Sequence, residues 1–207
     1  MRILRAWHGF TSSGSPIIDV KDVPLDWSGL ATLSGPSGSG KTTLFRLLSG
    51  WYDDDRTVCE FDPPLDRFRQ IRFIGAQDSL LPWRSVEGNL RFHGFPPAVI
   101  DSVLTGVGLN PEIRSRPVYE MSYGMYKRIE LLIAIAEKPE LLLLDEFFSS
   151  IDDIAKTVIR DYVLSARPQY PTWIIAHEEN LRRWLSPVSY SLVVNQERRC
   201  VVGIKRL

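Results

Sequence analysis

The chain has 207 residues, of which 44% are hydrophobic, so it is long enough to bury the core of one large domain. Its 25 Lys and Arg residues balance its 25 Asp and Glu residues, so it lacks the basic excess typical of nucleic-acid-binding proteins. No apolar run approaches the roughly 18 residues that indicate a membrane span, and the first residues lack the apolar segment of a signal peptide. The two cysteines, Cys59 and Cys200, match no metal-binding spacing and suggest no disulfide framework, and the lack of a framework favours a reducing cytoplasm.

The first third of the chain is dominated by the alternating patterns that are typical of strands. Strands are predicted over residues 2–8, 17–27, 29–33, 56–61 and 70–74. Between the third and the fourth of these, an amphipathic pattern predicts a helix over 43–48 that ends at Gly50.

Longer helical patterns dominate the middle of the chain. From about 78 to 121, turn signals separate helical patterns near 85–92 and 97–106, which predicts a small helical insert. Beyond it the pattern predicts a helix over 123–137, a strand over 141–144, a helix over 152–166, a strand over 172–176 and two short strands within 188–205. Such alternation predicts an α/β fold with a mostly parallel sheet, which binds its ligand at the carboxyl ends of the strands.

Between the predicted strand over 29–33 and the helix over 43–48 lies a phosphate-binding P-loop pattern, G-x-x-x-x-G-K-[ST]. The glycines allow a tight turn close to a polyphosphate, and the backbone N–H groups and the helix N-terminus attract anions. We expect Lys41 to reach the terminal phosphates and the Thr42 hydroxyl to hold Mg²⁺. The alternative, a flexible Gly/Ser-rich linker, does not explain Lys-Thr-Thr between a strand and a helix. The nucleotide-binding residues predicted here are Gly35, Pro36, Ser37, Gly38, Ser39, Gly40, Lys41, Thr42 and Thr43.

The run Leu141-Leu142-Leu143-Leu144-Asp145-Glu146 is the second strong signal. A buried strand delivers two carboxylates at its carboxyl end, where an α/β sheet binds its ligand. Beside a P-loop, Asp145 is expected to hold Mg²⁺ and Glu146 to activate the attacking water as general base. The alternative is that the pair caps the following helix.

Three further segments give weaker signals when each is taken alone. Gln77 and His177 follow predicted strands, where Gln77 can contact Mg²⁺ or water and His177 can steady a γ-phosphate, although each is also an ordinary strand-end residue. Ser122 and Gly124 lie at the start of the long helix, where they form either an anion site or a plain N-cap.

In their order and spacing these segments resemble the ATP-binding cassette (ABC) ATPases over essentially the whole chain. The family's order is P-loop, Gln loop, signature motif, Walker B Asp-Glu, D-loop and switch His. The resemblance implies that Phe10 stacks on adenine and that Asp152, in Ser149-Ser150-Ile151-Asp152, is the D-loop aspartate. It also implies a head-to-tail dimer in which Ser122 and Gly124 of one subunit face the ATP of the other.

The signature motif departs from the family's pattern. Where the family has Leu-Ser-Gly-Gly-Gln, this chain has Met121-Ser122-Tyr123-Gly124-Met125. Tyr123 adds a ring where the backbone approaches phosphate, and a side chain there would strain a glycine-type conformation. This departure concerns the half of the site supplied by the partner subunit.

The segment from Gln77 to Leu90 looks like the same segment in the nitrate, aliphatic-sulfonate and taurine importer branch. In the family this region contacts a coupling helix of the membrane subunit, and a Trp-Pro surface suits a helix groove. The alternative is that Leu80, Leu81 and Trp83 pack the core of the helical insert.

The sequence is therefore interpreted as one ABC ATPase domain over 1–207. We expect a P-loop NTPase core with a mixed, mostly parallel sheet, N-terminal antiparallel strands and a helical subdomain over about 78–138. The expected cofactors are ATP and Mg²⁺. The expected partners are an integral membrane permease, a second ABC ATPase subunit and a substrate-binding protein, but no nucleic acid. The permease would hold the chain on the cytoplasmic face of the membrane.

Three alternatives remain at this point. One is a soluble ABC ATPase that moves no solute. Another is a low-activity regulatory cassette that pairs with a complete one, an idea motivated by Tyr123 and Met125. The third is an unrelated P-loop kinase or GTPase, although the sequence has no Asn-Lys-x-Asp guanine-reading motif.

Overall fold

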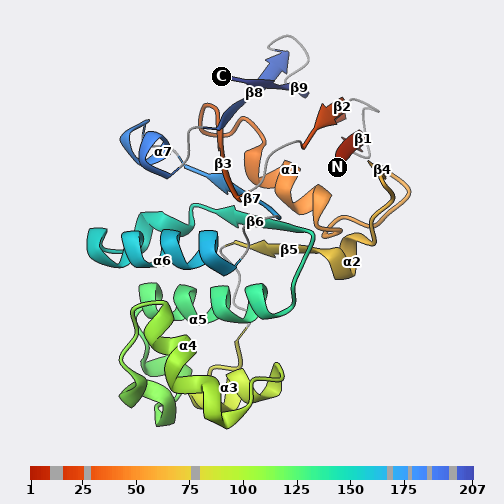
Figure 1. Cartoon of the computed structure of the whole chain (residues 1–207). Coiled ribbons are helices and arrows are strands. Elements are labelled where there is room, and N and C mark those ends of the chain that lie inside the picture. The colour runs from red at the N-terminus through yellow and green to blue at the C-terminus, as the bar shows by residue number, and fades with distance from the viewer. Residues whose placement is uncertain are drawn as a thin grey trace. The chain divides into compact units, whose positions relative to one another are not determined.

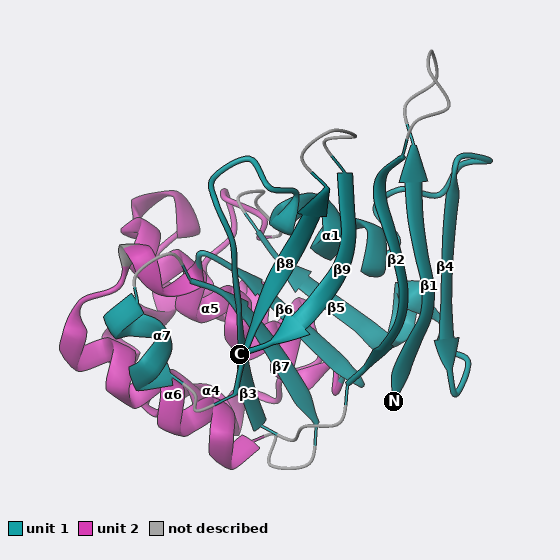
Figure 2. Ribbon diagram, turned by 90° about the horizontal axis from the view of Figure 1, so that it is seen from above, with its two compact units in different colours: residues 1–75, 139–146, 169–207 teal, residues 76–138, 147–168 magenta. Residues whose placement is uncertain are grey.

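The computed structural model describes residues 1–9, 16–25, 29–75, 80–166, 170–176, 179–185, 188–195 and 200–207. The chain forms two compact units (Figure 2). The first unit contains Met1–Gly75, Pro139–Glu146 and Gln169–Leu207, and the second contains Ala76–Lys138 and Phe147–Pro168.

The first unit is built on a nine-stranded sheet in the order β4-β1-β2-β9-β8-β3-β7-β6-β5. Strands β5, β6, β7, β3 and β8 are parallel neighbours, and β9 pairs in parallel with β2. Antiparallel pairs join β8 to β9 and join β1 to both β2 and β4. The predicted α/β fold with a mixed, mostly parallel sheet and N-terminal antiparallel strands is confirmed. The strands are β1 (Arg2–Gly9), β2 (Pro16–Pro24), β3 (Gly29–Ser34), β4 (Thr57–Asp62), β5 (Ile71–Ile74), β6 (Leu141–Asp145), β7 (Pro171–Ile175), β8 (Ser189–Asn195) and β9 (Cys200–Arg206).

Helix α1 (Lys41–Leu48) packs against this sheet in the first unit (Figure 1). Its apolar positions Leu44, Phe45 and Leu48 are fully buried, and the centroid of the Phe45 ring lies 5.7 Å from that of the Trp173 ring in β7. Burying a large apolar side chain stabilises a fold by roughly 1.5–3 kcal/mol. The helix that follows the P-loop is therefore firmly fixed to the strands.

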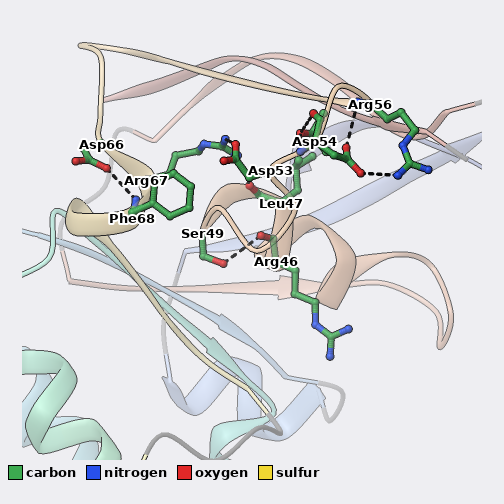
Figure 3. A network of polar contacts seen from close by, with 10 residues as sticks. Arg46, Leu47, Ser49, Asp53, Asp54, Arg56, Asp66, Arg67 and Phe68 are labelled. Atoms are coloured by element: carbon green, nitrogen blue, oxygen red, sulfur yellow. Dashed lines mark hydrogen bonds and ion pairs between the residues drawn. The ribbon is translucent and has the colours of Figure 1, made fainter. Parts of the chain in front are cut away.

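A polar network holds the chain just after α1 (Figure 3). The helix ends before Gly50, which adopts a left-handed φ of 78°. The guanidinium of Arg67, in the short helix α2 (Arg67–Gln70), donates to the carbonyl of Leu47 at 3.1 Å and to Asp53 at 3.3 Å. The last carbonyls of a helix have no partner within it. The Leu47 carbonyl also accepts from the Gly50 amide at 3.3 Å, so Arg67 is an additional donor that ties α2 to the end of α1.

The second unit is helical and has its own apolar core. Val86, Leu90, Leu104 and Ile129 are fully buried in it. Its helices are α3 (Val86–Phe92), η1 (Pro97–Val99), α4 (Ile100–Gly106), η2 (Pro111–Ser115), η3 (Val118–Glu120), α5 (Tyr123–Ala136), η4 (Phe147–Ser150) and α6 (Asp153–Ala166).

In the segment from Gln77 to Leu90, the described residues include both a buried core residue and an exposed aromatic residue. Leu80 is only 4% exposed and belongs to the apolar core of the second unit, whereas 71% of Trp83 is exposed. The buried Asn89 accepts a hydrogen bond from the Leu81 amide at 2.8 Å and donates to the Leu81 carbonyl at 3.0 Å. These two bonds fix the turn that carries Trp83.

Some predicted boundaries differ from the structure. Helix α1 begins at Lys41, two residues earlier than predicted, because Gly40 is its N-cap. Strand β2 ends at Pro24, although the pattern predicted a strand to residue 27, and residues 26–28 lie outside the described residues. Helix α2 was not predicted, because its four residues hold too little periodicity, and α7 (Glu179–Leu185) was also missed. Within the described part of the chain, no helix combines the length and hydropathy needed to cross a membrane.

Candidate functional site

The P-loop connects β3 to α1 through backbone conformations that only glycine adopts without strain. Gly38 has a φ of 72°, and Gly40, the N-cap of α1, has a φ of 92°. A Cβ added to Gly40 would lie 3.1 Å from Cγ2 of Val201, closer than such atoms normally approach. The glycines are therefore required by the shape of the turn.

A pocket of about 640 Å³ opens at this loop. It is lined by residues 36–43 of the P-loop and by Glu146, and Ile17 and Val194 add apolar surface from β2 and β8. Sequence reasoning missed Ile17 and Val194, since an apolar residue near a strand end gives no signal that it lines a site. The pocket combines polar groups suited to phosphate with apolar surface suited to a sugar or base.

Lys41 is held inside the loop that it terminates. Only 5% of the residue is exposed, and its Nζ donates hydrogen bonds of 2.9 Å to the carbonyls of both Gly35 and Pro36. Burial lowers the pKa of Lys41, while the nearby carboxylates of Asp145 and Glu146 act in the opposite direction. The ammonium group thus fixes the fold of the loop and brings a positive charge to the pocket.

The two motifs predicted to bind Mg²⁺ meet in the structure. Oγ1 of Thr42, at the start of α1, donates a 2.7 Å hydrogen bond to Oδ2 of Asp145, at the end of β6. Burial raises the pKa of Asp145, whereas the Thr42 hydrogen bond lowers it. Asp145 does not cap a helix within the described residues, because its Oδ2 bonds Thr42 and its Oδ1 has no partner there.

Two buried polar atoms test whether the site fits a nucleotide with Mg²⁺. Oγ of Ser39 and Oδ1 of Asp145 are both buried, and neither has a hydrogen-bond partner within the described residues. A buried polar atom without a partner is costly. A hydroxyl in the loop can donate to a phosphate oxygen, and a carboxylate oxygen can bind a hard cation or its water. The residues present therefore fit a Mg²⁺–nucleotide complex.

Glu146 lines the pocket in a strained backbone conformation. Its φ is 50°, which is rare for a residue that is not glycine. Residues with such backbone conformations are frequent at functional sites, and each conformation destabilises the fold by about 1–3 kcal/mol. The conformation is thus consistent with selection for the position of the carboxylate.

The predicted signature residues lie at the start of α5 in the second unit. Ser122 is the N-cap, and its Oγ accepts a hydrogen bond from the Met125 amide at 3.3 Å. Tyr123 begins the helix and is not among the residues with positive φ, so the strain expected from a glycine-type conformation is absent at this described position. Half of Tyr123 is exposed.

Asp152 precedes α6, also in the second unit. Its Oδ1 accepts a 2.9 Å hydrogen bond from the Ala155 amide, and this bond lowers the pKa of Asp152. Arg128 donates to the carbonyls of Gly124 at 3.2 Å and Gly108 at 2.8 Å. Asp152 thus acts as a helix cap, and Arg128 braces the first turn of α5.

Three predicted site residues, Phe10, Gln77 and His177, lie outside the described residues. Their predicted contacts with adenine, Mg²⁺ and the γ-phosphate therefore stay predictions.

Comparison with known proteins agrees with this geometry. Residues 24–149 match the profile of the family described as ABC transporter. The chain is 27% identical over 180 residues to the aliphatic sulfonates import ATP-binding protein SsuB 2 of Pseudomonas syringae pv. tomato, covering 84% of this chain and 75% of that protein. It is 31% identical over 175 residues to the uncharacterized ABC transporter ATP-binding protein YtlC of Bacillus subtilis, covering 79% of this chain and 67% of that protein.

A solved structure described as an ATP-binding subunit of an ABC transporter shares the fold. Its TM-score is 0.80 at 18% sequence identity, and the match covers 100% of this chain and 89% of that one. The family profile matches more than half of the 207 residues and includes both the P-loop and the Asp145–Glu146 pair. The protein therefore belongs to the ABC transporter family and is one of its ATP-binding, ATP-hydrolysing cassettes.

Proposed function

We propose that this cassette is the motor subunit of an ABC importer, in which ATP-driven closure of two cassettes drives a separate membrane permease. The observation that carries the proposal is the pocket lined by Lys41, Thr42 and Glu146, in which Thr42 is hydrogen-bonded to Asp145. The relative named for aliphatic sulfonate import supports an importer. The resemblance of the segment from Gln77 to Leu90 extends the proposed solutes to nitrate-, sulfonate- or taurine-like molecules. A substrate-binding protein would deliver the solute, and the permease would hold the cassette on the inner face of the membrane.

Within one subunit, the P-loop binds and orients the phosphates of ATP. Lys41 supplies positive charge, and the N–H groups at the start of α1 supply donors to phosphate oxygens. Thr42 and Asp145 would hold Mg²⁺, which when bound neutralises charge on the β- and γ-phosphates. The residues Gly35, Pro36, Ser37, Gly38, Ser39, Gly40 and Thr43 complete this proposed binding set, with Phe10 stacking on the adenine.

Glu146 is proposed as the general base that takes a proton from the attacking water. Its place at the end of β6 and on the pocket lining supports this role. We propose that Gln77 and His177 complete the site by positioning the water and steadying the γ-phosphate. Phosphoryl transfer depends mainly on positioning and charge stabilisation, so losing one of these groups should cost much of the rate.

The second half of each site is proposed to come from the partner subunit. Ser122 and Gly124, at the start of α5, would close over the partner's ATP, and Asp152 would lie in the D-loop between subunits. The two compact units would act as one ABC ATPase domain, and the second unit, which includes residues 76–138, would serve as its helical subdomain.

The test is light scattering on the Glu146→Gln protein with and without ATP and Mg²⁺. An ATP-dependent shift from monomer to dimer supports a homodimeric motor. No shift, with ATP binding intact, points to a different cassette as the partner and so to a heterodimer. Unchanged steady-state hydrolysis in Glu146→Gln contradicts the general-base role. Co-purification with a multi-span membrane protein distinguishes the transporter subunit from an ABC ATPase that moves no solute.

A further inference from the structure

Tyr123, where the chain departs from the family's signature pattern, lies beside a buried ion pair. Nζ of Lys127 is 2.7 Å from Oε2 of Glu130, and their side chains are only 2% and 3% exposed. The same Nζ lies 5.3 Å from the centroid of the Tyr123 ring and 5.9 Å from that of Tyr126. All four residues belong to α5, so one helix sets the arrangement.

This geometry draws the Tyr123 ring along the side of the helix. An ammonium close to an aromatic face attracts it, and the attraction is stronger when the charge is removed from water. Residues four apart lie on the same side of a helix, so Lys127 is well placed to hold the Tyr123 ring. Since the same ammonium bonds Glu130, about two turns beyond Tyr123, the ring is drawn away from the N–H groups at the start of α5.

The backbone leaves the ring free to adopt this position. Ser122 has the extended conformation of an N-cap, with φ −64° and ψ 156°, and α5 begins directly at Tyr123. Because 52% of Tyr123 is exposed, neighbouring residues do not enclose its ring. The contact with Lys127 therefore favours a ring that lies along the helix over a ring that lies across the N-terminus of the helix.

We propose that Lys127 is a positioning residue. Together with Glu130 it holds the Tyr123 ring along the side of α5, so that the turn from Ser122 to Met125 stays open to the nucleotide of a partner cassette. The inference rests on the proposed function, in which this turn closes over the partner's ATP. Where the family's pattern has a glycine with no side chain to displace, this chain uses a buried ion pair to keep the side chain aside.

Substitutions at the half-exposed Tyr123 test the inference with little risk to folding. In the Glu146→Gln background, the dissociation constant of the ATP- and Mg²⁺-dependent dimer is measured by light scattering across a concentration series. Tyr123→Phe keeps the aromatic face and is expected to match the parent, as is Tyr123→Ala, which has no ring to displace. Tyr123→Leu keeps bulk without an aromatic face and is expected to weaken dimerisation about tenfold, as loss of one desolvated cation–π contact predicts.

A second set of variants acts on the ion pair. Lys127→Met with Glu130→Leu removes both charges and so leaves neither one buried alone. This double change is expected to weaken dimerisation about tenfold when Tyr123 is present and by less than about twofold when Tyr123→Ala is added. Lys127→Arg keeps the cation and is expected to stay close to the parent. ATP binding to the monomer and thermal unfolding report that each variant is folded.

Each contrary outcome has a distinct meaning. An equal loss with and without Tyr123→Ala would show that the ion pair only stabilises α5, and would overturn the inference. Stronger dimerisation of Tyr123→Ala than of the parent would show that the ring obstructs closure, which overturns the inference and leaves the proposed function standing. No dimer in any variant, with ATP binding intact, would show that this turn does not close on a second copy even with the ring held aside, which overturns the inference and leaves the proposed function with a different cassette as the partner.

Discussion

The hydroxyl of Thr42 donates a 2.7 Å hydrogen bond to Oδ2 of Asp145, joining the start of α1 to the end of β6 across 103 residues of sequence. The two groups proposed to hold Mg²⁺ thus hold each other, and the second carboxylate oxygen, Oδ1, is buried without a partner among the described residues. Ligands fixed in this way need little rearrangement when a cation binds, which favours affinity.

Thr42→Val removes this hydroxyl with almost no change in shape. We expect nucleotide affinity in the presence of Mg²⁺ to fall about 10-fold to 30-fold, because the bound cation loses one hydroxyl ligand, a contact comparable to a hydrogen bond to a charged group at about 1.5–2 kcal/mol. Affinity in EDTA should change little. Nucleotide titrations with Mg²⁺ and with EDTA measure both values. Thr43→Val, which alters a proposed nucleotide contact but no metal ligand, is the matched control and should change affinity by the same factor in both buffers. An equal loss in both buffers would argue against a role for Thr42 in metal binding.

Replacing Lys41 should weaken nucleotide binding for two reasons. Lys41→Ala removes the positive charge from the pocket and the two hydrogen bonds that fix Gly35 and Pro36. A loss of about 10-fold to 100-fold in affinity corresponds to the roughly 1.5–3 kcal/mol of a hydrogen bond to a charged group. Calorimetric titration measures the change. Lys41→Met keeps most of the buried stem, so normal binding by that variant would mean that packing, and not charge, is what Lys41 provides.

The strained backbone of Glu146 predicts a trade of stability against activity. Glu146→Gly and Glu146→Ala both remove the carboxylate and its contacts, but only glycine relieves the φ of 50°. The glycine variant should therefore be more stable than the alanine variant by about 1 kcal/mol. Urea unfolding of the nucleotide-free proteins measures this difference, and both variants should lose hydrolysis. If the alanine variant is as stable as the glycine variant, position 146 carries no backbone strain.

The ion pairs of Arg114 predict a pH dependence of stability in the second unit. Arg114 bonds Glu87 at 3.0 Å and Asp101 at 2.9 Å. The hydrogen bond from Arg114 holds the pKa of Glu87 below its ordinary value of 4.5. A carboxylate with a lowered pKa in the fold stabilises above its unfolded pKa, and this contribution disappears as the pH falls through the folded value.

Glu87→Gln should therefore be less stable than the parent at pH 7, and the two should converge as the pH falls below 4.5. Thermal unfolding at several pH values measures this convergence. Glu120→Gln changes an exposed glutamate of η3 and serves as control, with little expected effect. If the difference in stability between Glu87→Gln and the parent stays constant as the pH falls well below 4.5, the charge of Glu87 does not contribute to stability.

Cys59 should react slowly with thiol reagents at neutral pH. Burial raises the pKa of its thiol to about 11, although Arg67 acts in the opposite direction. Only the thiolate is nucleophilic, so in a Cys200→Ala protein the rate of alkylation by iodoacetamide should rise about tenfold per pH unit from 7 to 10. In urea the rate should level off near the pKa of an ordinary thiol. If the alkylation rate of the folded protein also levels off near the pKa of an ordinary thiol, the pKa of Cys59 is not raised by the fold.

Several parts of the site follow from local sequence alone. The P-loop needs a glycine at Gly40 for its left-handed turn, and this requirement is visible in the pattern itself, whereas the left-handed Gly38 stands at a variable position of the pattern. The four leucines before Asp145 identify a buried strand, so the carboxylates at its end could be placed at the edge where the sheet binds ligands. The long helices α5 and α6 were predicted because each has enough turns to show a periodicity.

By itself, then, the sequence determined the family, the α/β fold and the chemical groups of the nucleotide site, because glycine conformations, hydrophobic periodicity and motif order are properties of the chain read in order. Only the tertiary structure decided which distant side chains meet: that Thr42 bonds Asp145, that Ile17 and Val194 line the pocket, and that Lys127 is buried against Glu130 beside Tyr123. These contacts depend on the order of strands in the sheet and on side-chain packing, which arise only when segments far apart in the sequence come together.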